Sequence, residues 1–422
     1  MTATHVLCDL TQSYAANGGG IRTYLTEKRS FIDRHTPHTH LLIVPGAEDR
    51  ASRQGRHITV EIASPKISAS PNYRFLLRSH AVLRALREYR PTTIECLCAY
   101  NLPWTAIWHR RQAPETSLIA GYRTDFPTVY VEEYAKKIFG HWSAPKFRRL
   151  AYAYARKLYG KFDGVYALNS GMAETLGKGG SKEIDVLPLG IDPVQFNPNR
   201  RDDGWRSSIG AAPGDPVLVY AGRIDEEKEA DVVFDAFSKL PDEMNAHLVM
   251  LGDGNLLNRL RQAGDGKRIH FPGFIGDRAQ LGRILASSDI YVSAMAFETF
   301  GISIIEAQAA GLPVVGVNAG AMPDRVSPGL GILGPVGDAE AMAANIAKIW
   351  STGEARQMGA QAYDHANTQY SWQRTFEHLF GHIYPKASGL QFLGDISAQT
   401  AGAGTPVGEE AEPNLTRPIF SG

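Results

Sequence analysis

Strand-like and helix-like segments alternate along almost the whole chain, and this alternation constrains the fold more than any other feature of the sequence. The predicted strands are THVLCDL, HTHLLIVP, TTIECLC, SLIAGY, GVYAL and EIDVLPL, followed after residue 216 by VLVYAGR, HLVMLGDG, RIHFPGF, DIYVSA and PVVGV. Most are separated by helical stretches, such as the one that places Ile21, Tyr24, Leu25 and Ile32 on one face. Strands that alternate with helices form parallel sheets covered on both faces. The sequence therefore predicts an α/β protein with doubly wound sheets.

A Pro- and Gly-rich passage between residues 188 and 216 interrupts the alternation. A chain of 422 residues is too long for one hydrophobic core. We therefore expect an N-terminal domain over 1–187 and a C-terminal domain over 188–372, with a helix over 373–390 that packs back toward the first domain. Residues 391–422 include the polar, Gly- and Pro-rich stretch QTAGAGTPVGEEAEPN and are predicted to be disordered.

The net charge is zero but is unevenly distributed. Residues 1–185 contain 26 Lys and Arg against 16 Asp and Glu, a net charge of +10, and the remainder carries −10. Opposite charges suggest different partners for the two halves, although no nucleic-acid-binding motif accompanies the basic half. We find neither a membrane-spanning stretch nor the features of a signal peptide. The three cysteines, Cys8, Cys96 and Cys98, are expected to be buried thiols in a reducing cytoplasm.

Parallel sheets bind ligands beyond the carboxyl ends of their strands, and three such loops carry unusual residues. In the first, Gly18, Gly19 and Gly20 precede a helix, so the backbone there can approach a phosphate, but a flexible turn explains them equally well. In the second, Arg223 and Lys228 flank a strand-to-helix turn and could neutralise a diphosphate. Salt bridges to nearby acids are the alternative, and on its own the favoured one. These acids are Asp225, Glu226, Glu227 and Glu229.

The third loop is ETFGISIIEAQAAGLPVVG at 298–316, where two glutamates stand eight positions apart. Ordinary helix capping explains Glu298. Glu306 lies among apolar helix residues, so its carboxylate needs polar partners, and ribose hydroxyls are suitable ones. The backbone N–H groups of Phe300, Gly301 and Ile302 are expected to face a phosphate. Together the three loops predict a pocket for a nucleoside diphosphate attached to a hydroxylated group.

These loops, with AGRIDEEKEADVVFDAFSKL, LVMLGDG and HFPGFI, resemble the retaining nucleotide-sugar glycosyltransferases of family 4, over nearly all of residues 1–385. The resemblance implies the GT-B fold, in which two Rossmann-like domains face each other across a cleft. It assigns Glu298 to the transferred sugar, Glu306 to the ribose, and Arg223 and Lys228 to the diphosphate. The catalytic residues that it implies are Arg223, Lys228 and Glu298. The substrate-binding residues that it implies are Gly19, Gly20, Arg123, Asp125, Gly222, Gly252, Phe274, Ile275, Thr299, Phe300, Gly301, Ile302 and Glu306, with the base held near Phe274 and Ile275.

The N-terminal half carries a narrower resemblance. IECLCAYNLPWTAI and GYRTDFPTVYVEEY look like the subgroup that glycosylates membrane lipids and related mannose acceptors. Many of its members carry a His two positions before the Asp, where it contacts the donor sugar, but this chain has Arg123 before Asp125. Arginine cannot act as a base, although it can hold an anionic group or a diphosphate oxygen. Asp324 in NAGAMPD is a second departure, because a Glu is common there.

The resemblance implies transfer of a hexose, of glucose or mannose type, from a UDP- or GDP-linked donor with retained anomeric configuration. No Asp-x-Asp pair stands near the loops, and Arg223, Lys228 and helix N-termini can stabilise a leaving diphosphate. We therefore expect neither a required metal nor another cofactor. A dinucleotide oxidoreductase would need Gly-x-Gly-x-x-Gly, which AANGGG does not supply. A non-catalytic protein that binds sugar nucleotides on the same fold stays open.

The stretch AKKIFGHWSAPKFRRLAYAYARKLYGKF at 135–162 holds eight Lys and Arg and no acid, interleaved with aromatic residues. This pattern suits a helix lying on an anionic membrane surface. A solvated helix whose aromatic side chains pack beneath the strand GVYAL is the alternative. We predict a lipid or lipid-linked acceptor at the cytoplasmic face of the cell membrane, with a soluble saccharide or small molecule as the second possibility.

Overall fold

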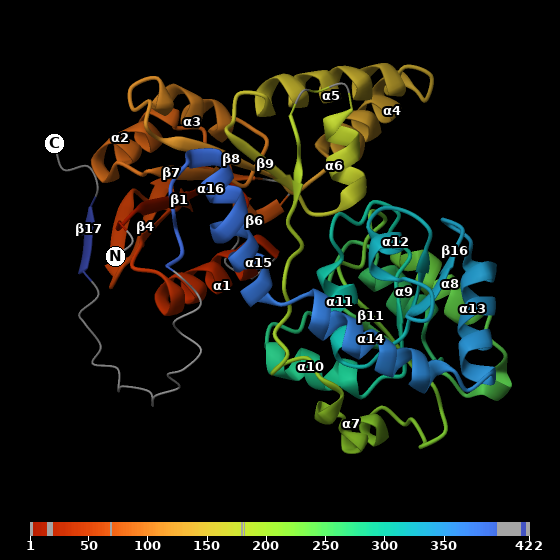
Figure 1. The fold of residues 1–422 in the computed structure, drawn as a ribbon. Helices are drawn as coiled ribbons and strands as arrows, with labels where there is room; N and C mark the ends of the chain where they lie inside the picture. The colour runs from red at the N-terminus through yellow and green to blue at the C-terminus, as the bar shows by residue number, and fades with distance from the viewer. Residues whose placement is uncertain are drawn as a thin grey trace, which may run out of the picture. The chain divides into compact units, whose positions relative to one another are not determined.

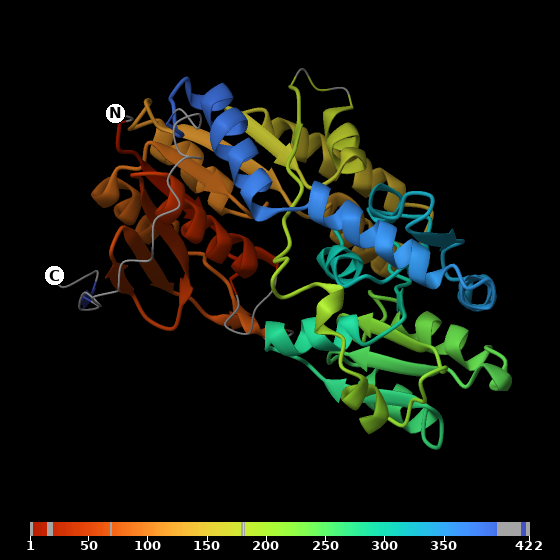
Figure 2. The same ribbon diagram turned by 60° about the horizontal axis from the view of Figure 1, so that its bottom comes forward.

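The computed structural model describes residues 3–14, 20–67, 70–178, 180, 182–394 and 415–418. The chain forms two compact units, of which unit 1 comprises Met1–Leu187 with Gln373–Gly422 and unit 2 comprises Pro188–Trp372. In each unit a mainly parallel sheet lies between helices, as Figures 1 and 2 show. The protein is therefore an α/β protein with two Rossmann-like domains, as the alternation of strands and helices predicts.

Unit 1 contains a nine-stranded sheet in the order β10-β9-β8-β7-β1-β2-β4-β3-β17. Its strands are β1 Val6–Leu10, β2 Thr39–Gly46, β3 Arg50–Gln54, β4 His57–Ala63, β7 Thr93–Cys96, β8 Ser117–Tyr122, β9 Gly164–Ala167, β10 Asp185–Val186 and β17 Leu415–Pro418. All neighbours pair in parallel except β3, which runs antiparallel to both β4 and β17. A separate hairpin is formed by β5 Lys66–Ile67 and β6 Ser70–Arg74. The central strands β7 and β8 are buried along their whole length and β1 is buried except at Val6, which is why they are mostly apolar.

Helices lie on both faces of this sheet, as Figures 1 and 2 show. They are α1 Gly20–His35, α2 Ser79–Tyr89, α3 Leu102–Arg110, α4 Glu133–Phe139, α5 Ala144–Tyr159, α6 Ser170–Gly177, α15 Trp372–His378 and α16 Tyr384–Ser388, with π-helical segments η1 Pro127–Glu132 and η4 Leu379–Ile383. The predicted single helix over 135–162 is wrong, because Gly140 adopts a φ of 79° and ends α4. The chain resumes a helical course only at Ala144.

Unit 2 contains a six-stranded parallel sheet in the order β13-β12-β11-β14-β15-β16. Its strands are β11 Val217–Ala221, β12 His247–Leu251, β13 Ile269–Gly273, β14 Ile290–Val292, β15 Val314–Val317 and β16 Gly331–Gly334. Its helices are α7 Asp203–Ser208, α8 Ala230–Ser238, α9 Leu257–Ala263, α10 Arg278–Ala286, α11 Ile302–Ala309, α12 Met322–Arg325, α13 Ala339–Ser351 and α14 Ala355–Gln369, with short turns η2 Pro198–Arg200 and η3 Asp242–Met244. The five strands predicted after residue 216 are all present, and β16 was not predicted.

Two segments near the chain end differ from the predicted disordered tail over 391–422. Phe392 is completely buried and its carbonyl group is 2.8 Å from Nε2 of His38, so the ordered part extends past residue 391. Its ring also packs on His5 and Tyr384, which explains why a hydrophobic residue after the last helix is fixed. Residues 415–418 form β17 on the edge of the sheet. The rest of the predicted tail lies outside the described residues.

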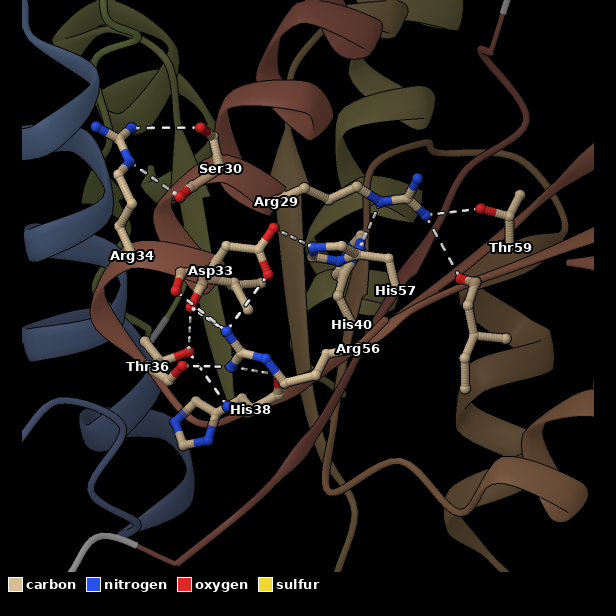
Figure 3. A network of polar contacts seen from close by, with 12 residues as sticks. Arg29, Ser30, Asp33, Arg34, Thr36, His38, His40, Arg56, His57 and Thr59 are labelled. Carbon is tan, nitrogen blue, oxygen red and sulfur yellow. Dashed lines mark hydrogen bonds and ion pairs between the residues drawn. The ribbon is translucent and has the colours of Figure 1, made fainter. Parts of the chain in front are cut away.

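The C-terminal end of α1 is fixed to the sheet by the polar network of Figure 3. Arg56, just before β4, donates hydrogen bonds to the carbonyl groups of Asp33 (3.1 Å), His38 (3.2 Å) and Thr36. Helix ends leave such carbonyl groups without intrahelical partners, and a guanidinium satisfies several at once. This bracing fixes the position of the helix that carries the buried charge described below.

Candidate active site

Backbone hydrogen bonds join the chain at the carboxyl ends of three neighbouring strands of unit 2, β11, β12 and β13. The N–H of Gly222, after β11, donates to the carbonyl of Leu251 (3.0 Å), and the N–H of Gly252 donates to that of Gly273 (3.0 Å). Gly252 has a φ of 142°, and a Cβ there would lie 1.9 Å from the carbonyl oxygen of Gly222. Only glycine fits this close approach. The loops that the sequence analysis selected at Gly222 and Gly252 are therefore locked to one another.

Lys228, in the loop after β11, and Glu298, in the loop after β14, form an ion pair. Nζ of Lys228 lies 3.1 Å from Oε2 of Glu298 and 2.8 Å from Sδ of Met295. The other oxygen of Glu298 accepts the N–H groups of Thr299 (3.1 Å) and Gly301 (3.0 Å). Burial alone would raise the pKa of Glu298, but the Lys228 ammonium and the backbone N–H donors outweigh it and lower that pKa below its ordinary value. The carboxylate is thus held ionised.

The backbone turn after Glu298 corrects one expectation. Gly301 has a φ of 77°, and a Cβ there would lie 2.5 Å from Cδ1 of Ile304, so this turn into α11 requires glycine. The turn directs the N–H groups of Phe300 and Gly301 toward the Glu298 carboxylate. The sequence analysis expected these N–H groups to face a phosphate, but in the structure they point to the carboxylate instead. The carboxylate takes the place of the anion as the partner of these donors.

Arg223 and Lys228 differ in their partners. Arg223 forms ion pairs with Asp225 and with Glu227 (2.8 Å), which are two of the acids that the alternative interpretation named. Lys228 pairs instead with Glu298, far away in the sequence. Its own backbone N–H donates to Asp225 at 3.0 Å, and this bond shapes the turn that lies between the two cations. The two basic side chains therefore share one loop, with Arg223 about half exposed.

Glu306 lies on α11 with 3% of its surface exposed, surrounded by the apolar residues that the sequence analysis identified. Its Oε1 accepts a hydrogen bond from Nη2 of Arg278 at 2.6 Å. The guanidinium of Arg278 also stands 4.6 Å from the ring centroid of Phe196. Burial raises the pKa of Glu306, and the opposing effect of Arg278 does not cancel it, so the pKa stays above its ordinary value.

The remaining predicted contacts of unit 2 are divided between exposed and buried positions. Phe274, directly after β13, is 63% exposed and presents an aromatic face, and Ile275 follows it. Phe300 is buried beneath Arg325, whose guanidinium lies 4.3 Å from its ring centroid and whose Nε donates to its carbonyl at 2.9 Å. Thr299 and Ile302 are partly buried beside it. Asp324, next to Arg325 on α12, is exposed.

The predicted contacts of unit 1 lie at the ends of α1 and β8. Gly20 is the first residue of α1, whereas Gly18 and Gly19 fall outside the described residues. Arg123 follows β8 directly and is buried. Asp125 accepts hydrogen bonds from the hydroxyl groups of Tyr122 (2.6 Å) and Tyr152 (2.7 Å), so its orientation is fixed.

A completely buried charge cluster, which the sequence analysis missed, lies behind Arg123 in unit 1. Lys28 of α1 places its Nζ 2.7 Å from Asp9 and 2.7 Å from Glu95. Glu95 also accepts hydrogen bonds from three tyrosine hydroxyl groups. They belong to Tyr24 (2.8 Å), Tyr166 (2.5 Å) and Tyr384. Buried charges need such partners, because an uncompensated one is strongly destabilising. The signal in the sequence was Lys28 itself, four residues after Tyr24 on the buried face of the helix.

Comparison with known proteins identifies the family. Residues 18–195 match the family described as Glycosyltransferase Family 4, and residues 202–365 match Glycosyl transferases group 1. A GDP-mannose-dependent alpha-(1-6)-phosphatidylinositol dimannoside mannosyltransferase of Mycobacterium tuberculosis is 30% identical over 304 residues, covering 72% of this chain and 76% of the relative. The chain belongs to glycosyltransferase family 4. A second relative of this family 4 glycosyltransferase, a GDP-mannose-dependent alpha-mannosyltransferase of the same species, is 28% identical over 73% of this chain and 78% of its own length.

A solved structure with the same fold is sucrose-phosphate synthase from Thermosynechococcus elongatus, with a TM-score of 0.70 and 17% identity over 90% of this chain and 98% of that one. This likeness concerns the fold. Among the described residues of the family 4 glycosyltransferase, no helix is long and apolar enough to cross a membrane. Within the same part of the chain, no group of His, Cys, Asp and Glu side chains is placed to hold a metal ion.

Arg278 is the residue of this glycosyltransferase site that sequence reasoning missed. It begins α10, four residues after Phe274, and binds the buried carboxylate of Glu306. The only signal was an arginine at the start of a helix, where a cation is unfavourable with respect to the helix dipole and so needs another reason. Its acidic partner supplies that reason.

Proposed function

We propose that the protein is a retaining hexosyltransferase that transfers a mannose- or glucose-type sugar from a nucleotide diphosphate sugar to a lipid or lipid-linked acceptor at the cytoplasmic membrane face. The observation that carries this proposal is the ion pair of Lys228 and Glu298, 3.1 Å apart at the carboxyl ends of the strands of unit 2. It sets a cation suited to a diphosphate beside an ionised carboxylate suited to sugar hydroxyl groups.

In this proposal each residue keeps the role that the family resemblance implies. Arg223 and Lys228 hold the diphosphate, and both then exchange part of their carboxylate contacts for phosphate oxygens. Glu298 orients the transferred sugar. Glu306 binds the ribose through its carboxylate, of which the ion pair with Arg278 uses Oε1. The exposed ring of Phe274 offers a stacking surface for the base.

The proposed reaction proceeds with retention. The acceptor oxygen attacks the anomeric carbon on the face from which the diphosphate leaves, while the bond between that carbon and the diphosphate oxygen breaks. The departing oxygen takes the acceptor proton, and negative charge develops on the diphosphate. Lys228 and Arg223 stabilise this charge without a metal ion, because both are held at the site before the reaction begins.

GDP-mannose is the favoured donor, because the relatives that match over three quarters of their length are named as GDP-mannose-dependent. UDP-linked hexoses are the alternative. A panel of sugar nucleotides, assayed with excess EDTA, tests the donor and the metal requirement together. We expect hydrolysis or transfer from one donor to survive the chelator, with the anomeric configuration of the product retained by NMR. Loss of activity that manganese rescues would disprove metal independence, and binding without turnover would favour the non-catalytic alternative.

The surface of α4, α5 and their connection supports a lipid acceptor. Large apolar side chains are exposed along it, the most exposed being Trp142 at 85%. The others are Tyr134, Ile138, Phe139, Phe147, Leu150 and Tyr154. Phe139 and Phe147 stack on each other at 5.2 Å, and Lys146 lies 4.5 Å from the Trp142 ring. Three other aromatic residues of this stretch are buried, namely Tyr152, Tyr159 and Phe162. The alternative interpretation, in which the aromatic side chains pack inside the unit, therefore applies only to these three.

An exposed apolar surface interleaved with lysines and arginines suits the interface of an anionic membrane. The M. tuberculosis relative named for phosphatidylinositol dimannoside supports the same class of acceptor. A soluble saccharide or small molecule remains the second candidate, in which case the basic residues would serve to attract anions.

Binding to liposomes tests this part of the proposal. Co-sedimentation is expected to rise with the fraction of anionic lipid and to fall with salt, because charges are screened over about 10 Å at 0.1 M ionic strength. Trp142→Ala should weaken binding at every salt concentration, since the exposed ring supplies apolar contact. Trp205→Ala, at a half-buried position in α7 of unit 2, is the control and should bind as the wild type does. If the protein ignores anionic liposomes at low salt, the soluble acceptor is favoured.

A further inference from the structure

Arg123 is a buried cation whose guanidinium has no hydrogen-bonding partner among the described residues. Only 8% of its surface is exposed, and it forms no hydrogen bond or ion pair with any described residue. Its Nη1 is completely enclosed and has no hydrogen-bond partner in the described part of the chain. A buried guanidinium normally has its donors satisfied, because leaving them unpaired is costly. The described part of the chain does not provide the hydrogen-bond acceptor that such a side chain needs.

The guanidinium is held in place by an aromatic ring. Its Cζ stands 4.5 Å from the ring centroid of Tyr24, a cation–π arrangement that fixes the plane of the group but uses none of its N–H donors. Tyr24 is fixed in turn, because its hydroxyl donates to Glu95 at 2.8 Å. Gly121, two residues earlier, leaves room for the Tyr166 hydroxyl, which also reaches Glu95. Arg123 therefore stands in a preorganised position.

The buried carboxylates nearby are already neutralised. Asp9 and Glu95 give two negative charges, and Lys28 forms an ion pair with both. Arg29 supplies a second positive charge close by, although its hydrogen bond goes to His40 and not to a carboxylate. His40, which contacts Asp9 and Arg29 (the latter contact drawn in Figure 3), adds no charge at neutral pH, because burial lowers its pKa to about 4. Arg123 forms an ion pair neither with these carboxylates nor with Asp125, which accepts hydrogen bonds from Tyr122 and Tyr152.

A pocket in unit 1 opens onto Arg123. Arg123 is the only charged residue among those that line it in the described part of the chain. Ser13, Thr124 and Tyr100 also line it and carry hydroxyl groups. Burial raises the pKa of Tyr100 to about 12 and that of Cys98, another lining residue, to about 11. Both are neutral at physiological pH, so nothing in the lining repels an anion.

We propose that this pocket binds an oxyanion of the acceptor, a phosphate or carboxylate group that pairs with Arg123. This inference rests on the proposed glycosyl transfer and names the chemistry of its acceptor. A planar guanidinium offers two parallel N–H donors to two oxygens of such a group, and the pocket's hydroxyl groups supply further donors. The diphosphate of the donor has its own cations in unit 2, so the charge of Arg123 is left for the other substrate.

Isothermal titration of the full-length protein tests the site with three matched probes, glycerol 3-phosphate, glycerate and glycerol. The titration is made with saturating GDP, so that Arg223 and Lys228 are occupied. We expect glycerol 3-phosphate or glycerate to bind and glycerol not to bind, and the stronger of the two anions identifies the oxyanion. Arg123→Met should weaken anion binding by about ten- to a hundredfold, as the loss of a charged hydrogen-bonding partner does. Arg123→Lys should give an intermediate affinity, because it keeps the charge but not the planar fork.

Two further measurements keep the outcomes distinct. GDP binding to Arg123→Met shows that the protein is folded, and it should be unchanged. Failure of the wild type to bind either GDP or UDP would disprove the proposed function. Equal anion binding by wild type and Arg123→Met, with nucleotide binding intact, would disprove only the oxyanion site. A rise in KM for the sugar nucleotide alone, with KM for the acceptor unchanged, would assign the anion to the donor and overturn the proposal for the acceptor.

Discussion

Lys228→Ala is expected to lower kcat by about a hundredfold or more, because it removes a preorganised charge aimed at the leaving diphosphate. Arg223→Ala should act in the same direction. Lys228 is held by Glu298 and Met295 before the donor arrives, so its contribution to the transition state needs little reorganisation. Steady-state kinetics with the preferred sugar nucleotide should show the loss mainly in kcat, with a smaller change in KM.

The matched control is Lys239→Ala. Lys239 also forms an ion pair at 3.1 Å, with Glu340, but both side chains are exposed on unit 2. Exposed pairs of this kind contribute about 0–1 kcal/mol to stability, so the variant should keep its activity. Near-normal kinetics in both Lys228→Ala and Arg223→Ala would mean that the diphosphate binds elsewhere.

Lys228→Ala should also change the pH dependence of activity. The Lys228 ammonium is the main group that counters burial and keeps the pKa of Glu298 low. Without it, burial is opposed only by backbone N–H groups, so the pKa of Glu298 should rise. The contribution of a carboxylate with a lowered pKa is lost as the pH falls through that pKa, because the carboxylate becomes protonated. The acid limb of the residual activity of Lys228→Ala should therefore move to higher pH than in the wild type.

The fold could be predicted because its signals are local. Strands buried on both faces appear as short apolar runs, and VLVYA and HLVML are strands of unit 2 as predicted. The strand HITVEIA escaped notice because it alternates buried and half-buried residues near the sheet edge. EIDVLPL yields only the two-residue β10, since the chain leaves the sheet after Val186. Edge and boundary positions depend on packing that a local pattern does not record.

The candidate site was predictable only to the level of its loops. The carboxyl ends of parallel strands meet at one edge, so residues after β11 and before α11 could be assigned to one place. Which partner each side chain takes could not be read in this way. Arg223 forms ion pairs with acids of its own loop, Lys228 forms one with Glu298, and Glu306 forms one with Arg278. These choices depend on rotamers and on turns such as that at Gly301, which sequence spacing does not fix.

The unsatisfied guanidinium of Arg123 was still harder to foresee. The sequence showed that an arginine replaces a residue of another type, and hence that it cannot act as a base. That no described residue accepts a hydrogen bond from its Nη1 became visible only in the structure, where the nearby Glu95 has other partners. Glu95 is satisfied by Lys28 and three tyrosines from separate elements, the last of them from α16 near the chain end. No local pattern brings residues of β7, α1 and α16 together.

Glu306→Ala is expected to weaken binding of the donor by about 1–3 kcal/mol, the cost of losing a charged hydrogen-bonding partner, which is about five- to 150-fold in Kd. The ribose is common to the sugar nucleotide and the nucleoside diphosphate, so both ligands should be affected equally. Isothermal titration with GDP and GDP-mannose, or with the preferred donor of the panel, measures the two losses. Glu340→Ala, which removes an exposed carboxylate of the same unit, should leave both affinities unchanged.

Glu306→Gln separates this role from a purely structural one. Burial raises the pKa of Glu306, so folding favours its protonated form, and its ionisation costs stability as pH rises above the ordinary value of 4.5. Glutamine keeps the shape of the side chain and removes the cost of ionising a buried carboxyl group, but it loses the ion pair with the half-exposed Arg278. These two effects on stability oppose each other, so the thermal midpoint at neutral pH should fall only slightly. Donor affinity, in contrast, should still drop, and wild-type affinity should weaken as the pH falls through the raised pKa. A glutamine variant that binds the donor like the wild type at every pH would show that the ribose does not use this carboxylate.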